Sequence, residues 1–116
     1  MRFSPNEPPR HFQTGVDGAL TIADCGDLSL NENEQVSFVT DDGKRHDFAA
    51  KSWGFYATPS INGRLRDQGF KTALVRNGAG RRFVMVVDTD RMGDFLNYCL
   101  AEAQEVEEWL DDRPVG

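Results

Sequence analysis

The sequence FKTALVRNGAGRRFVMVVD, residues 70 to 88, decides the expected fold. Phe70 to Arg76 and Arg81 to Asp88 both favour β-strands, because they are rich in branched and aromatic residues. Asn77 to Gly80 lies between them and tolerates the positive φ angles of a tight turn, so the stretch predicts an antiparallel hairpin. Phe83 to Val87 is apolar on both faces. We therefore expect this strand to be central in its sheet and covered by a helix.

The residues after this hairpin predict a long helix from about residue 90 to residue 111. Asp88, Thr89 or Asp90 can cap its first turn. Apolar residues then recur with three- and four-residue spacing, at Phe95, Leu96, Cys99, Leu100, Ala103, Val106 and Leu110. The predicted fold class is α+β: a curled antiparallel β-sheet of about five to six strands, with one long C-terminal helix packed on it.

Upstream of the hairpin, four further segments have the alternation of short strands. They are residues 19–23, 28–30, 34–40 and 45–50. Asp24 to Asp27 is expected to break the first pair, and Asp41 to Lys44 is expected to form a hairpin loop. His46 lies two residues from Phe48, so it shares a strand face with it, and we interpret it as a partly buried strand histidine.

The N-terminus predicts a separate segment. Residues 1–14 contain three prolines and scattered charges, so we expect a flexible N-terminal arm, followed by a single α+β domain over residues 15–116. The N-terminus has no apolar core of a signal peptide. No apolar run approaches the roughly 20 residues that cross a membrane. We therefore expect a cytoplasmic protein that does not bind membranes.

Charge is distributed unevenly along the chain, which has a formal net charge of −6. Residues 61–82 hold six Lys or Arg and one Asp, whereas residues 83–116 hold two Arg and nine acids. An acidic protein is poorly suited to bulk nucleic-acid binding, which neutralises many phosphates. The basic segment 61–82 can still attract one small anion. The acidic segment is expected either to face solvent or to meet a basic partner.

The stretch from Trp53 to Arg66 is the predicted ligand-binding site. Aromatic rings beside polar groups suit carbohydrate and nucleotide ligands, and arginine forks bind phosphate. The candidate ligand-binding residues are Trp53, Tyr56, Thr58, Asn62, Arg64, Arg66 and, from the hairpin, Arg76. In the alternative interpretation the aromatic residues fill the edge of the core and the arginines lie in water.

Catalytic interpretations of this sequence are weaker. Cys25 is flanked by Asp24 and Asp27, which raise a thiol pKa and oppose thiolate chemistry, so we interpret Cys25 as structural. Cys99 lies on the apolar face of the predicted helix and is expected in the core. Asp88 and Asp90 are better explained by helix capping than by acid–base chemistry. The histidines have no ligand spacing with the cysteines, so we predict no metal and no cofactor.

Two segments resemble an uncharacterised bacterial protein family. They are Cys25 to Phe38, CGDLSLNENEQVSF, and Lys51 to Leu65, KSWGFYATPSINGRL. Members of this family accompany enzymes that make surface polysaccharides or their nucleotide-sugar precursors. The resemblance assigns no catalytic residue, and it implies that a ligand would be of the sugar type.

The sequence thus leaves three functional hypotheses. The first is a protein that binds an anionic sugar-type ligand, such as a phosphorylated sugar or a nucleotide sugar, or that assists a polysaccharide or nucleotide-sugar enzyme. The second is a protein–protein interaction module without a small-molecule ligand. The third is a small enzyme that uses Cys25 or His46, and the sequence favours a binding role over this one.

Overall fold

The structure is a computed structural model that describes residues 1–115. These residues are mainly β, with eight strands, two α-helices and three short 3₁₀ helices. In chain order the elements are β1 (Arg2–Thr14), a 3₁₀ helix (Val16–Gly18), β2 (Leu20–Ser29), β3 (Gln35–Val39), β4 (Arg45–Lys51), β5 (Gly54–Ala57), α1 (Arg64–Asp67), β6 (Phe70–Arg76), β7 (Arg82–Asp88), a 3₁₀ helix (Thr89–Arg91), α2 (Met92–Ala101), β8 (Glu105–Trp109) and a 3₁₀ helix (Leu110–Asp112).

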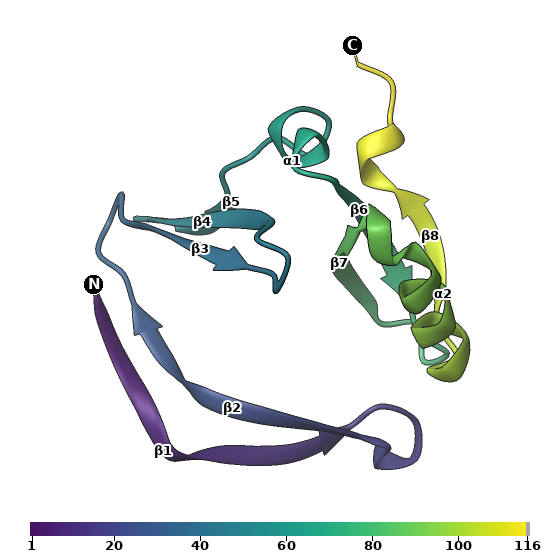
Figure 1. Cartoon of the computed structure of the whole chain (residues 1–116), viewed down its shortest axis with the longest axis horizontal. Helices are drawn as coiled ribbons and strands as arrows, with labels where there is room; N and C mark the ends of the chain where they lie inside the picture. The colour runs from purple at the N-terminus through teal and green to yellow at the C-terminus, as the bar shows by residue number, and fades with distance from the viewer. Residues whose placement is uncertain (116) are drawn as a thin grey trace. The chain divides into compact units, whose positions relative to one another are not determined.

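The strands form three small sheets, and the predicted single sheet of five to six strands is wrong. Their strand orders are β1–β2, β3–β4–β5 and β7–β6–β8 (Figure 1). The chain divides into two compact units. Unit 1 comprises Met1–Ser37 and Asp47–Thr58, and unit 2 comprises Phe38–His46 and the chain from Pro59 onward. Each unit is described by itself.

The predicted long C-terminal helix is also wrong. Helix α2 has ten residues and ends at Ala101, and residues 105–109 form strand β8 instead of further helical turns. Ala103 adopts φ 51°, a left-handed conformation that stops a right-handed helix. The Gln104 amide then donates to the Cys99 carbonyl at 2.9 Å, which satisfies one terminal carbonyl of the helix. The chain turns back, and β8 pairs with β6.

The hairpin of residues 70–88 is confirmed, but its two strands exchange their expected places. Strands β6 and β7 pair antiparallel without interruption from Phe70–Asp88 to Arg76–Arg82. Strand β6 is central, because β8 pairs with its other edge, and β7 is an edge strand. The apolar run in β7 therefore does not mark the middle of this sheet.

Unit 2 holds most of the buried side chains. Its core consists of Leu65, Phe70, Ala73, Val75, Val87 and Cys99. Helix α2 lies beside the β7–β6–β8 sheet, and the Phe95 ring of α2 meets the Trp109 ring of β8 edge-on at 5.9 Å (Figure 1). The prediction that Cys99 belongs to the core is confirmed.

In unit 1 the structure has a long hairpin where a flexible arm was expected. Strand β1 pairs antiparallel with β2 from Arg2–Ser29 to Thr14–Leu20. The register shifts where β1 passes from Pro5 to Arg10, the proline-rich part of the strand. Neither β1 nor β2 contains a buried residue.

The β3–β4–β5 sheet confirms the expected strands at residues 34–40 and 45–50. Ala49 and Ala50 of β4 are buried. The Ala50 amide and carbonyl both bond to the turn before β3, through Glu34 O at 2.9 Å and Asn33 N at 2.8 Å. Strand β5 is the edge strand of this sheet and carries part of the predicted ligand site.

Candidate functional site

Trp53 and Tyr56 are the aromatic half of the predicted site, and both are exposed. Trp53 lies in the turn between β4 and β5, with 69% of its surface accessible, and Tyr56 lies in β5 with 44% accessible. Their ring centroids are 5.9 Å apart and the planes are inclined by 34°. Aromatic surface in water is costly, so these side chains are available for a ligand or a partner.

Thr58 and Asn62 add little to this pair. Thr58 belongs to unit 1, and its hydroxyl lies 2.9 Å from Gln35 Oε1. Asn62 belongs to unit 2, where it is exposed in the turn before α1. The predicted site is thus divided between the two units.

The arginines of the predicted site lie in unit 2, and two of them meet carboxylates. Arg66 of α1 donates to the Asp111 carbonyl, and its Nη2 lies 3.6 Å from Asp111 Oδ2 and 3.8 Å from Asp112 Oδ1. Arg64 is exposed on the same short helix. An incoming phosphate would therefore compete with carboxylates already present.

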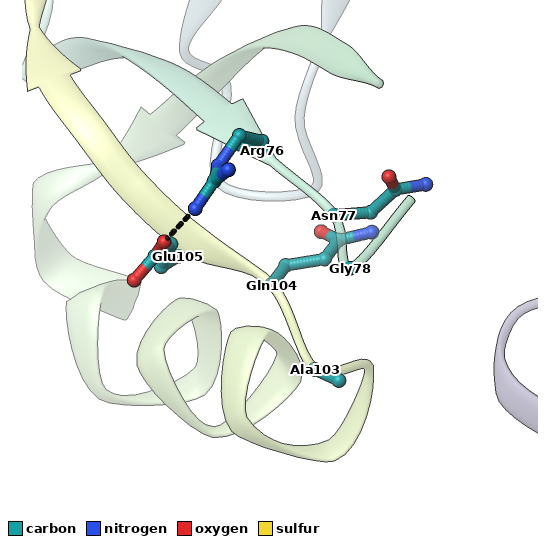
Figure 2. A pocket seen from close by; sticks show the side chains of 6 residues that line it. All are labelled: Arg76, Asn77, Gly78, Ala103, Gln104 and Glu105. Carbon is teal, nitrogen blue, oxygen red and sulfur yellow. Dashed lines mark hydrogen bonds and ion pairs between the residues drawn. The ribbon is translucent and has the colours of Figure 1, made fainter. Parts of the chain in front are cut away.

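The third arginine of the site, Arg76, borders a hollow of about 230 Å³ (Figure 2). The hollow is lined by Arg76, Asn77, Gly78, Ala103, Gln104 and Glu105. Arg76 Nη2 bonds to Glu105 Oε1 at 2.6 Å, and its Nε lies 3.2 Å from Glu107 Oε1, an ion-pair contact. Because two carboxylates neutralise the guanidinium, the polar groups left for a ligand are mainly amides. One of them, Gln104 Oε1, is buried and has no hydrogen-bond partner among the described residues.

Four of the six cations of the basic segment pair with carboxylates of the acidic C-terminal segment: Arg66, Lys71, Arg76 and Arg82. Helix α1 and strands β6 and β7 supply the cations, and β8 with the following 3₁₀ helix supplies the anions. The pairs that join β8 or the following 3₁₀ helix to β6 or β7 are Lys71–Asp111, Lys71–Asp112, Arg76–Glu105, Arg76–Glu107 and Arg82–Glu107. The hydrogen bond from Arg82 lowers the pKa of Glu107 below its usual range. Much of the positive charge of the basic segment is therefore already paired with the acidic segment in the fold.

A second carboxylate cluster surrounds Lys44. Its Nζ lies 2.5 Å from Asp88 Oδ1 and 3.1 Å from Asp90 Oδ2. The hydrogen bond from Lys44 lowers the pKa of Asp88. Asp88 Oδ1 also accepts from the Asp90 amide and so caps the 3₁₀ helix Thr89–Arg91, which confirms Asp88 as a capping residue. The cap was predicted for the α-helix, but α2 begins after Arg91, which makes no side-chain capping bond. Asp42 lies close to both aspartates, and the Lys44 ammonium supplies the positive charge that this cluster attracts.

The two residues considered for catalysis, Cys25 and His46, lie in different units. Cys25 is exposed in β2 of unit 1, and its thiol donates to the Ala23 carbonyl at 3.6 Å. His46 is buried at the start of β4 in unit 2, as expected, and its ring lies 6.4 Å from the Phe70 ring.

The hairpin β1–β2 holds a surface that the sequence prediction missed. Cross-strand pairs place Phe3 opposite Leu28 and Phe12 opposite Ile22. Ile22 and Leu28 are six residues apart in β2, so they share a strand face, and each phenylalanine lies on the same side as the residue opposite it. The register shift of β1 thereby brings Phe3 and Phe12 to one side, which we call the hairpin face. All four are exposed, between 37% and 52%. The alternation of Leu20, Ile22 and Leu28 was a signal for this face, but the prolines of β1 pointed to an arm instead.

A charged pair lies in the middle of the hairpin face. Arg10 Nη2 bonds to Asp24 Oδ2 at 3.1 Å, and the guanidinium lies over the Phe12 ring at 5.2 Å. The Arg10–Asp24 pair separates the two apolar pairs along the hairpin. The face therefore combines apolar area with one salt bridge at its centre.

Comparison of this chain with family models, with curated proteins and with solved structures finds no match. Among residues 1–115, no helix is long and apolar enough to cross a membrane.

Proposed function

We propose that this chain is a protein-interaction module that binds a partner protein through the hairpin face. One observation carries this proposal: β1 and β2 bury none of their residues, yet they align four large apolar side chains on one side. A two-stranded hairpin in water is marginally stable by itself. Covering its apolar face removes that area from water, at roughly 25 cal/mol per Å².

The chemistry of the face describes the partner. Phe3 with Leu28 and Phe12 with Ile22 require an apolar surface on the partner, as in the fully buried centre of a protein interface. The Arg10–Asp24 pair between them requires polar groups at the facing position of the partner's surface. An ion pair that becomes buried in an interface needs its remaining hydrogen bonds satisfied. A phosphate or a polyanion would not use the four apolar side chains.

Site-specific photo-crosslinking in cells that make the protein tests this proposal. A photoreactive amino acid replaces Phe12 on the hairpin face, and the matched control replaces His11, which is exposed on the opposite face. We expect a crosslink to a second protein from position 12 and none from position 11. A crosslink from position 12 only to other residues of the same chain would overturn the proposal.

A second candidate is the sugar-type ligand, supported by the exposed pair of Trp53 and Tyr56. Two adjacent aromatic rings are a suitable platform for a sugar or a base. The resemblance to a family that accompanies polysaccharide enzymes points the same way. Because Arg66 and Arg76 already pair with carboxylates, we expect weak, salt-sensitive binding of sugar phosphates or nucleotide sugars, roughly micromolar to millimolar.

A titration followed by amide chemical shifts tests this second candidate. Replacing Arg64 and Arg66 together by Ala should remove the phosphate-dependent part of the binding, and Tyr56→Phe should weaken it modestly. If phosphorylated sugars perturb no amide between Trp53 and Arg82, the ligand hypothesis fails while the crosslinking result stands.

A further inference from the structure

Strand β7 is an edge strand that lacks the usual protection against pairing. It has seven residues without proline or glycine, and its register with β6 contains no bulge. Its central residues, Phe83 to Val87, are apolar, and Val84 is 65% exposed. The opposite edge, β8, carries three glutamates and a register shift against β6. Charges and bulges are devices by which proteins block edge pairing, so β8 is protected and β7 is not.

The backbone groups of β7 that face away from β6 can be identified from the ends of the hairpin. The Arg81 carbonyl accepts from the Asn77 amide, and the Thr89 amide donates to the Gly69 carbonyl. In an antiparallel pair the residues that bond to the neighbour alternate with those that face outward. The backbone N–H and C=O groups of the odd-numbered residues of β7 therefore point toward β6. The N–H and C=O groups of Arg82, Val84, Val86 and Asp88 face outward along the free edge.

We propose that β7 pairs antiparallel with β7 of a second copy, with the two-fold axis at Met85. In this register Arg82 lies opposite Asp88 of the other copy, and Val84 lies opposite Val86. These four positions are the ones whose backbone groups face outward, so every outward group gains a partner. The two three-stranded sheets then join into one sheet of six strands.

Charge complementarity selects this register over its neighbours. The cationic end of β7, Arg82, meets the anionic end, Asp88, at both ends of the paired strands. Within its own chain Arg82 already bonds to Glu107 through Nε, and Asp88 already bonds to Lys44 through Oδ1, so each new pair extends an existing ion pair. A register shifted by two residues places either Arg82 opposite Val86 or Asp88 opposite Val84, and it leaves one outward residue of each β7 strand unpaired. Opposite charges directly across two strands are favourable by roughly 0.2–1 kcal/mol. This inference is independent of the proposed function, because the hairpin face belongs to unit 1 and β7 to unit 2.

Analytical ultracentrifugation of the full chain is the first test. We expect the native protein to sediment as a dimer at tens of micromolar, and Val84→Lys to raise the dissociation constant about tenfold or more, since lysine protects natural edges. Phe55→Lys is the matched control, because Phe55 is similarly exposed, at 68%, but lies in β5, and it should leave the dimer unchanged. A native protein that is monomeric at about 100 micromolar, or a dimer that survives Val84→Lys unaltered, overturns the proposal.

Disulfide trapping then tests the register. In a Cys25→Ser background, Met85→Cys places two thiols opposite each other in a non-hydrogen-bonded pair, with Cα atoms about 4.5 Å apart, within disulfide range. Val84→Cys is the control, because residue 84 faces residue 86 of the other copy and its own counterpart is farther than a disulfide spans. We expect mild oxidation to link the Met85→Cys chains and to leave the Val84→Cys chains unlinked. Linking at residue 84 instead of residue 85 overturns the proposed register.

Discussion

Lys71 Nζ lies 2.9 Å from Asp111 Oδ2, although forty residues separate them in the sequence. The Asp111 side chain has no solvent-accessible surface, and its other oxygen accepts from the Thr72 amide at 2.9 Å. One carboxylate thus ties the 3₁₀ helix after β8 to the central strand β6. This contact accounts for part of the positive charge that the sequence suggested was free for a ligand.

Replacing Asp111 by Ala should destabilise unit 2 by roughly 2–3 kcal/mol. The substitution leaves the buried Thr72 amide without an acceptor and Lys71 without its closest partner. Urea unfolding measures the loss. Asp112→Ala is the control, since Asp112 is 58% exposed, and it should change stability by no more than about 0.5 kcal/mol. Equal losses for the two variants would contradict this role of Asp111.

The contribution of Asp111 should depend on pH in a defined direction. Burial raises the pKa of Asp111, but the hydrogen bonds from Lys71 and the Thr72 amide outweigh it and hold that pKa below its ordinary value. A group whose pKa is lower in the folded state binds its proton more readily when unfolded. The stabilisation is therefore complete above the unfolded pKa, about 3.9, and is lost as the pH falls through the folded pKa.

Unfolding at a series of pH values checks this direction. The difference in unfolding free energy between the native protein and Asp111→Ala should be constant from about pH 5 to pH 8 and should shrink below about pH 4. A difference that grows as the pH falls would contradict the sign of the pKa shift.

The sequence was sufficient for local structure and insufficient for long-range pairing. The hairpin of residues 70–88 was predictable, because its strand propensity and its turn residues agree over a short distance. The segment Glu105 to Trp109 was not, because its apolar residues also fit a helical repeat. This segment is a strand because Ala103 adopts a left-handed conformation and because Glu105 pairs with Arg76 of β6. Both features exist only in the folded chain.

The same limit applies to the candidate site. The basic segment and the acidic segment are both visible in the sequence, but we predicted the role of each segment separately. Their opposite charges were the available signal that they pair, as Arg82 and Glu107 do in the structure. The exposure of Trp53 could not be predicted, because an aromatic residue in a Gly- and Pro-rich stretch is equally compatible with the edge of a core.

The order of strands in unit 2 predicts a difference between two valine substitutions. Val75 lies in the central strand β6 with no accessible surface, whereas Val86 is half-buried in the edge strand β7. Val75→Asp should cost roughly 3 kcal/mol or more through an unpaired buried charge, and Val86→Asp should cost less, about 1–2 kcal/mol. Urea unfolding at low protein concentration compares them. A larger loss for Val86→Asp would place β7 at the centre of the sheet.

The two cysteines should differ in their reaction with alkylating reagents. The sequence led us to interpret Cys25 as structural, but the structure places it on the surface. Cys99 is 6% exposed, and burial raises the pKa of its thiol, which reduces the reactive thiolate. Mass spectrometry after brief alkylation at pH 8 should find Cys25 modified and Cys99 protected until urea is added. Equal modification rates in the folded protein would show that the core around Cys99 opens readily.

Gly26 of β2 lies where a side chain would collide with the backbone of strand β1. It pairs with Pro5 at the register shift of β1 and adopts φ 145°. A Cβ atom at this position would lie 2.4 Å from the Ser4 carbonyl oxygen and 2.8 Å from Pro5 Cα. Both neighbours are backbone atoms, so β1 itself would have to move.

Gly26→Ala should therefore open the hairpin without unfolding unit 2. We expect hydrogen exchange of the β1 and β2 amides to accelerate about tenfold or more, since displacing β1 and straining the backbone costs at least about 1–3 kcal/mol. Exchange in β6 should not change, because that strand belongs to the other unit. Gly43→Ala is the matched control: Gly43 also has a positive φ, 87°, but a Cβ there meets nothing within 4 Å. It introduces the same kind of backbone strain without the crowding and outside the hairpin. If Gly26→Ala leaves exchange in β1 at the native rate, the close approach of the two strands at Pro5 is not what holds the hairpin face in place.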